Sequence, residues 1–155
     1  MDAESSPERR LEALGLVLPP PPAPGGNYLP FRRAGSLLFL AGVISSNQTG
    51  VLSGTIGGGR SIDEGREAAR CCALTHLAVL RVALGSLDSV DQILTVNGYV
   101  NAVPGFADSP QVINGASDLL VEVFGDTGRH ARAAIGVSGL PRNAMVELQM
   151  IVAVR

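Results

Sequence analysis

The stretch ARAAIGVSGLPRNAMVELQMIVAV, Ala131 to Val154, closes the chain and predicts two β-strands that each carry one charged residue. Side chains alternate between the two faces of a strand. Arg132 therefore lies on the face opposite Ile135, and Glu147 on the face opposite the apolar residues of the last strand. A charge inside a sheet costs free energy unless it is paired or solvated. The pattern indicates either a structural ion pair between strands or subunits, or a site where neighbouring strands direct Arg132 and Glu147 to a common point.

The residues before this stretch predict a two-layer α+β domain. Ser61-Ile62-Asp63-Glu64 fits a capping box, in which Ser and Glu each satisfy a backbone N–H of the other. Gly85 is a typical residue just after a helix end. The predicted elements are strands at 28–33 and 36–43, a loop at 45–59, a helix from 61 to 85, a strand at 90–101, a helix at 110–124 and the two closing strands. The order β-β-α-β-α-β-β predicts two helices packed on one face of a sheet, and the uncovered face predicts an oligomer.

The N-terminal region differs in composition from the rest of the chain. Residues 7–16 could form a short amphipathic helix, and the proline-rich run at 19–26 then ends it and extends as a linker. We therefore divide the chain into an N-terminal helix and proline-rich extension, residues 1–24, and a domain at residues 25–155.

Composition excludes several classes of protein. The chain has 155 residues, 46% of them hydrophobic and 17% charged, which suits one domain with apolar surface left for a subunit interface. All twelve basic residues are Arg, so a Schiff-base lysine mechanism is excluded. With a net charge of −2 and no Trp, we expect no nucleic-acid binding. The longest apolar run is too short to span a membrane.

Among the remaining polar residues, His130 adds one further candidate for a site. Cys71 and Cys72 are adjacent and lack a disulfide framework, and the N-terminus is polar, so we expect a reducing, cytoplasmic location. The glycines at 57–59 lack a phosphate-loop pattern. His76 fits a packed or surface histidine, whereas His130 lies two residues from Arg132 and could line a site. No zinc-ligand spacing is present.

Three short motifs follow one another near the end of the chain: Ala131-Arg132, Leu140-Pro141 and Val146-Glu147-Leu148. Together with residues 26–28, 37–42 and 112–114, which fit in the same order, they resemble the RidA/YjgF family of reactive-intermediate deaminases. The resemblance implies a chorismate-mutase-like fold, a mixed sheet with two helices on one face. It also implies a homotrimer with clefts between subunits, and hydrolysis of 2-imino or 2-enamino acids to 2-oxo acids and ammonia without a metal or cofactor.

The resemblance also implies roles for individual residues. Arg132 would grip the substrate carboxylate, and Glu147 would orient or deprotonate the attacking water. Asn114 would supply a polar contact, and Tyr28 would wall the cleft. Ala134 stands in the same pocket where members often carry Cys. Members also carry a small hydroxyl residue at the position of Ala41.

The two alanines leave alternatives to catalysis open. The same cleft could bind a 2-oxo acid or similar metabolite without chemistry, because both departures remove polar groups from the pocket. A third function, endoribonuclease activity, comes from labels used in the family. The acidic charge balance and the absence of a cationic surface argue against it.

Overall fold

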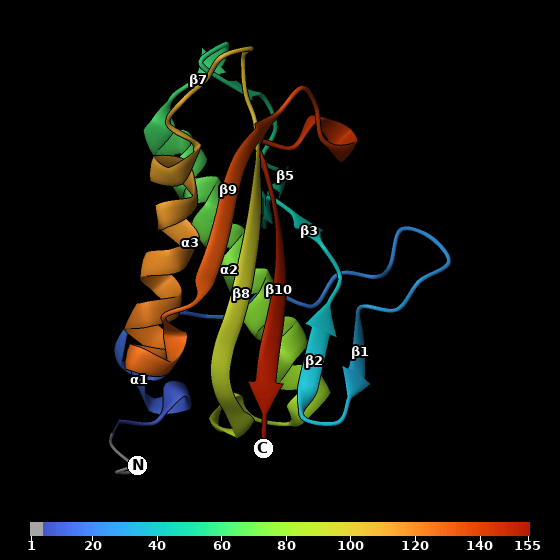
Figure 1. Cartoon of the computed structure of the whole chain (residues 1–155), viewed down its shortest axis with the longest axis vertical. Helices are drawn as coiled ribbons and strands as arrows, with labels where there is room; N and C mark the ends of the chain where they lie inside the picture. Colours follow the sequence, from blue (N-terminus) through green and yellow to red (C-terminus); the bar gives the residue numbers. More distant parts are fainter. Residues whose placement is uncertain (1–4) are drawn as a thin grey trace.

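One mixed β-sheet and two long helices form two layers in the computed structural model, which describes residues 5–155 (Figure 1). The strand order is β1-β2-β10-β8-β9, with β3 also paired to β10. β8 and β9 are parallel, and the other pairs are antiparallel. The main elements are α1 (Pro7–Ala13), β1 (Phe31–Ala34), β2 (Leu37–Leu40), β3 (Val43–Ile44), α2 (Ile62–Leu84), β8 (Val90–Asn101), α3 (Ser109–Phe124), β9 (Ala131–Val137) and β10 (Val146–Val154). The predicted fold class is confirmed.

The start of α2 shows the predicted capping box. The Ser61 hydroxyl accepts from the backbone N–H of Glu64 at 3.1 Å, and the Glu64 carboxylate accepts from the backbone N–H of Ser61 at 3.1 Å. Gly85 follows the helix in the left-handed conformation, at φ 81°. Local sequence chemistry therefore fixes both ends of the longest helix.

The short helix α1 packs on the domain. Leu11 is 2% exposed and belongs to the core. Glu8 accepts from Arg81 of α2 at 3.2 Å and from the backbone N–H of Leu87 at 2.9 Å. Contacts of α1 with α3 complete this docking. The first four residues of the predicted extension lie outside the described residues.

The segment predicted as a plain loop, residues 45–59, forms two small sheets, the second of which extends to Arg60. They are formed by β4 (Ser46–Asn47) with β5 (Gly50–Val51), and by β6 (Thr55–Ile56) with β7 (Gly59–Arg60). Strands of two residues are too short to show alternation in the sequence, so the pattern could not predict them.

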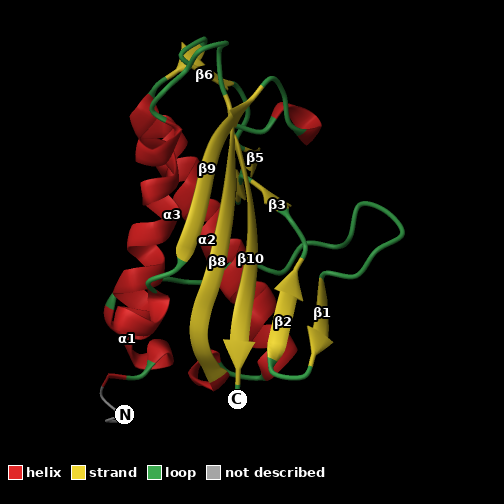
Figure 2. Ribbon diagram, in the orientation of Figure 1, coloured by secondary structure: helices red, strands yellow, loops and turns green. Residues whose placement is uncertain are grey.

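The predicted strand at 36–43 is interrupted at Ala41 and Gly42. On β10, Leu148 and Ile151 are three positions apart, but their partners Val43 and Phe39 are four positions apart. This extra residue is a bulge, a feature that often redirects side chains beside active sites. It splits the predicted strand into β2 and β3 (Figure 2).

The two long helices cover one face of the sheet, and no described helix covers the other (Figure 1). Alternate side chains of β10, from Val146 to Val154, are buried on the helix side. On the opposite face Phe39 is 42% exposed and Ile135 is 50% exposed. No described helix is long and apolar enough to cross a membrane.

Candidate functional site

Arg132 is held by α3, in a group that we call the arginine cluster: Arg132, Asn114 and Ser117. The guanidinium Nη1 donates to Asn114 Oδ1 at 2.7 Å and to Ser117 Oγ at 3.1 Å, and Nη2 donates to the backbone carbonyl of Pro110 at 3.4 Å. Arginine has five N–H donors, so these three bonds leave two. Nε has no partner among the described residues. The exposed guanidinium can therefore still bind a carboxylate through two donors.

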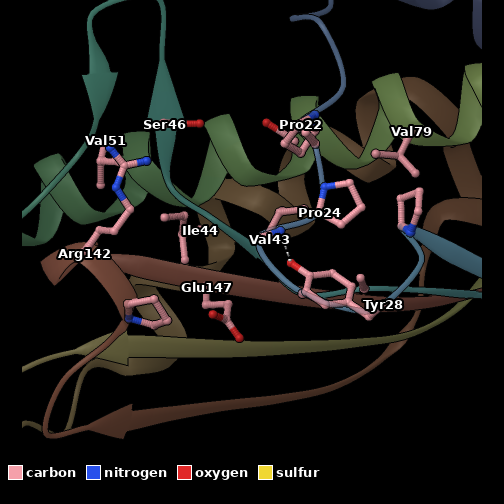
Figure 3. A pocket seen from close by; sticks show the side chains of 17 residues that line it. Pro22, Pro24, Tyr28, Val43, Ile44, Ser46, Val51, Val79, Arg142 and Glu147 are labelled. Atoms are coloured by element: carbon pink, nitrogen blue, oxygen red, sulfur yellow. Dashed lines mark hydrogen bonds between the residues drawn. The ribbon is translucent and has the colours of Figure 1, made fainter.

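Glu147 lines a separate cavity of about 470 Å³, which we call the glutamate cavity. Tyr28 and Arg142 lie on either side of it, with Glu147 between them in the view of Figure 3. The Tyr28 hydroxyl accepts from the backbone N–H of Gly25 at 3.0 Å, which ties the proline-rich arm to the cavity wall. The other lining residues are mostly small or apolar: Pro22, Ala23, Pro24, Gly25, Pro30, Ala41, Gly42, Val43, Ile44, Ser46, Val51, Thr75, Val79 and Pro141.

The carboxylate of Glu147 is partly desolvated and has no partner among the described residues. Burial raises its pKa above the ordinary value for glutamate. Gly42, in the bulge, lies close to this carboxylate. A Cβ atom at position 42 would be only 2.9 Å from Glu147 Oε2. Glycine at position 42 thus leaves room for the carboxylate. A carboxylate with a raised pKa and no ion-pair partner is suited to accept a proton.

Arg142 is a cavity residue that the sequence analysis missed. It has a left-handed backbone with φ 55°, and Asn143 follows at φ 57°. The buried Asn101 holds this turn by donating to Asn143 Oδ1 and to the carbonyl of Ala144, both at 3.1 Å. Arg142 directly follows the Leu140-Pro141 motif. This position was the one feature of the sequence that pointed to Arg142 as a site residue. The unusual turn that brings it to the cavity leaves no local pattern, since neither residue is glycine.

Within one chain, Arg132 and Glu147 lie on opposite faces of the sheet. Arg132 pairs with Val96 of β8, and Val96 pairs with Met150 of β10. Paired residues share a face, and Val96 and Met150 are both buried on the helix side. Glu147 precedes Met150 by three residues and therefore occupies the other face.

The expectation that the two strands are neighbours is wrong. β8 lies between β9 and β10. The reason is the crossover through α3, which returns the chain parallel to β8 on one side and leaves the other side for β10. The structure thus brings Arg132 together with Asn114, and it places Glu147 and Tyr28 in one cavity. Within one chain the two pairs do not meet.

The two alanine departures fall one in each half of the candidate site. Ala41 lines the glutamate cavity. Ala134 follows Arg132 by two residues, pairs with Gly98 and packs partly buried against the core. A hydroxyl at position 41 would enter the cavity, whereas a thiol at position 134 would point to the same side of β9 as Arg132.

The two histidines occupy different surroundings. His76 is fully buried, and its ring Nε2 lies 2.7 Å from the carbonyl of Leu148. Burial lowers the pKa of His76 to about 4. His76 is therefore a packed histidine, one of the two predicted alternatives. His130 contacts Ser117 of the arginine cluster.

Comparison with known proteins identifies close relatives. The profile of the family described as "YjgF/chorismate mutase-like, putative endoribonuclease" matches residues 8–154. Protein TCP17 of Trypanosoma cruzi is 41% identical over 144 residues, 92% of this chain and 90% of that protein. The family profile begins its match within α1, so that match includes the proline-rich arm.

Solved structures agree with the fold. The crystal structure of Atu1372 from Agrobacterium tumefaciens, a protein of unknown function, is 38% identical at a TM-score of 0.89, over 96% of this chain and 92% of that one. A protein from Shewanella oneidensis described as a "putative endoribonuclease" is 35% identical at a TM-score of 0.92, over 96% and 99%. RidA from an Antarctic Psychrobacter shares the fold at 20% identity and a TM-score of 0.62, over 86% and 94%.

Proposed function

Because this chain belongs to the YjgF/chorismate mutase-like family, we propose that it hydrolyses 2-imino and 2-enamino acids to 2-oxo acids and ammonia. One observation supports this activity above all others. The chain carries two groups that we take as halves of one site: a guanidinium with free donors, and a desolvated carboxylate without a partner among the described residues. Together they fit a small acid that also needs a water molecule activated beside it.

The two halves would meet between subunits. They lie on opposite faces of the sheet, so the arginine cluster of one copy would face the glutamate cavity of the next. Such a head-to-tail contact generates a ring where its rotation closes, and we propose a homotrimer. The exposed apolar residues of the uncovered face, Phe39 and Ile135 among them, would supply contact area for the ring.

The chemistry assigns a separate task to each half. Arg132, oriented by Asn114, binds the substrate carboxylate and fixes the C=N carbon near Glu147 of the neighbouring copy. Glu147 takes a proton from water while the oxygen of that water bonds to the imine carbon. The electron pair of the C=N bond moves to nitrogen. The Glu147 carboxyl returns the proton to nitrogen, which gives a carbinolamine. The Glu147 carboxylate then transfers the hydroxyl proton to the same nitrogen as the C–N bond breaks, so ammonia leaves and the 2-oxo acid remains. An imine carbon is already electrophilic, so the mechanism uses no metal or cofactor.

A coupled assay of 2-iminobutanoate and 2-iminopropanoate hydrolysis tests the proposal. Removing one partner of a charged, hydrogen-bonded contact costs about 2–5 kcal/mol, so Arg132→Ala should lower kcat/KM by at least about 30-fold. Arg129→Ala is the matched control, because Arg129 is an exposed cation three residues away that pairs with Asp126. Equal rates for wild type and Arg132→Ala would refute the assignment.

Ala41 favours one alternative, a site that binds 2-oxo acids without turnover. The alanine leaves the glutamate cavity without the hydroxyl donor expected there. Calorimetric binding of 2-oxobutyrate by a protein with no measurable deaminase rate would support this alternative. RNA cleavage by purified protein, abolished by Arg132→Ala, would instead support the endoribonuclease named in the family description.

A further inference from the structure

A chain of hydrogen bonds leads from Arg132 to His130. Arg132 Nη1 donates to Ser117 Oγ at 3.1 Å, and Ser117 Oγ lies 2.9 Å from His130 Nε2. His130 Nδ1 lies 2.7 Å from the backbone carbonyl of Gly128. The imidazole of His130 therefore links helix α3 to the turn that precedes β9. His130 lies two residues before Arg132 in the sequence.

The direction of each bond follows from the groups at its ends. A carbonyl oxygen can only accept, so Nδ1 of His130 must carry the proton that it shares with Gly128. In the neutral ring Nε2 is then an acceptor. The Ser117 hydroxyl must donate to Nε2, and its lone pair receives the Arg132 N–H. Neutral His130 thus fixes the direction of the Ser117 hydroxyl proton, and the oxygen of that hydroxyl then accepts from Arg132.

We propose that His130 and Ser117 are positioning residues that hold Arg132 ready for a carboxylate, and that protonation of His130 releases this hold. The inference rests on the proposed role of Arg132 in binding the acid. Protonation would place a hydrogen on Nε2, so both neighbours of Ser117 Oγ would donate to it. The hydroxyl proton would have to turn away, and a second cation would stand beside Arg132.

The surroundings of His130 keep it neutral at neutral pH. Burial lowers the pKa of His130, and the charge of Arg132 lowers it further, against a raising contribution from the Gly128 carbonyl. Acids on the neighbouring elements are paired elsewhere, Asp126 with Arg129 at 3.3 Å and Asp118 with Arg66 at 3.4 Å. Release of Arg132 should therefore occur on the acid side of neutrality.

Two substitutions at one position separate positioning from simple packing. His130→Gln keeps an acceptor that does not titrate, because the amide oxygen can take the Ser117 proton. His130→Ala removes the acceptor at every pH. Ser117→Ala removes the link between the imidazole and Arg132 and should resemble His130→Ala.

The experiment measures the Kd of 2-oxobutyrate by calorimetry between pH 5 and pH 8, with imine turnover measured in parallel. Hydrogen bonds to charged groups contribute about 1.5–3 kcal/mol, so wild-type binding should weaken toward the acid end of this range, by roughly tenfold or more for full protonation of His130. His130→Gln should bind within a few-fold of wild type at pH 8 and lose this dependence. His130→Ala and Ser117→Ala should bind weakly throughout. Protonation of Glu147 would strengthen anion binding at low pH and so has the opposite sign.

The results distinguish the inference from the proposed function. Wild type that binds as predicted but turns over no imine would refute the deaminase and leave the inference standing. Wild type that turns over imine, with a His130→Ala variant of unchanged affinity and pH profile, would overturn the inference alone. A His130→Gln variant that keeps the wild-type slope would also overturn it, as would the absence of 2-oxobutyrate binding at any pH.

Discussion

Arg132 and Glu147 face away from each other across one β-sheet, and β8 separates their strands. Each residue is incomplete in a different way: the arginine has unused donors, and the carboxylate has no partner among the described residues. A single chain therefore offers two half-sites. The proposed activity consequently depends on assembly as much as on either side chain.

Replacing Glu147 by Gln should remove the general base. We expect kcat to fall by about 10²–10⁴-fold, the usual contribution of a positioned base. In wild type the carboxylate acts above its pKa, which burial raises, so activity should fall as pH drops through that raised value. The pH profile of kcat for Glu147→Gln should lack this acid limb. Glu12→Gln, a change at an exposed helix residue, should leave the profile unchanged.

Gly42 should tolerate no side chain without loss of activity. Gly42→Ala would place a Cβ 2.9 Å from Glu147 Oε2, and the flexible carboxylate would have to move out of position. We expect kcat/KM to fall by about tenfold or more, because small displacements of reacting groups are costly, with little change in melting temperature. Gly139→Ala is the matched control, since a Cβ there meets nothing within 4 Å. Full activity of Gly42→Ala would contradict the role given to this close approach.

His76 should make the fold sensitive to acid. Its pKa in the folded protein is about 4, below the ordinary 6.5, so the unfolded chain binds a proton that the folded one refuses. Stability should then be lost as pH falls from about 6.5 to 4, by about 3 kcal/mol. Denaturant unfolding of wild type and His76→Gln measures this. Glutamine can still donate to the Leu148 carbonyl but does not titrate, so a variant with the wild-type slope would refute this role of His76.

Local chemistry in the sequence predicted much of the fold. Ser61 and Glu64 cap α2 through bonds three residues apart, and Gly85 ends that helix through its own backbone conformation. The alternation in β10 likewise assigned Glu147 to the face away from the core. Such features depend on neighbours within one or two turns of chain, so they can be derived without knowledge of the remainder.

Long-range arrangement was the part that sequence alone could not supply. The alternation pattern assigns a residue to a face of its own strand but does not say which strand lies beside it, and so β9 and β10 were wrongly expected to be adjacent. Arg142 reaches the cavity through a left-handed turn that Asn101 anchors from 42 residues away. Neither relationship leaves a periodic signal.

Subunit mixing tests the central claim most directly. Arg132→Ala and Glu147→Gln should each be inactive in the imine-hydrolysis assay when purified alone. When equal amounts are co-expressed or unfolded and refolded together, a quarter of the interfaces in a head-to-tail ring combine both intact halves, so activity should return to about 25% of wild type. Mixed oligomers that form but remain as inactive as the separate variants would contradict a site shared between chains.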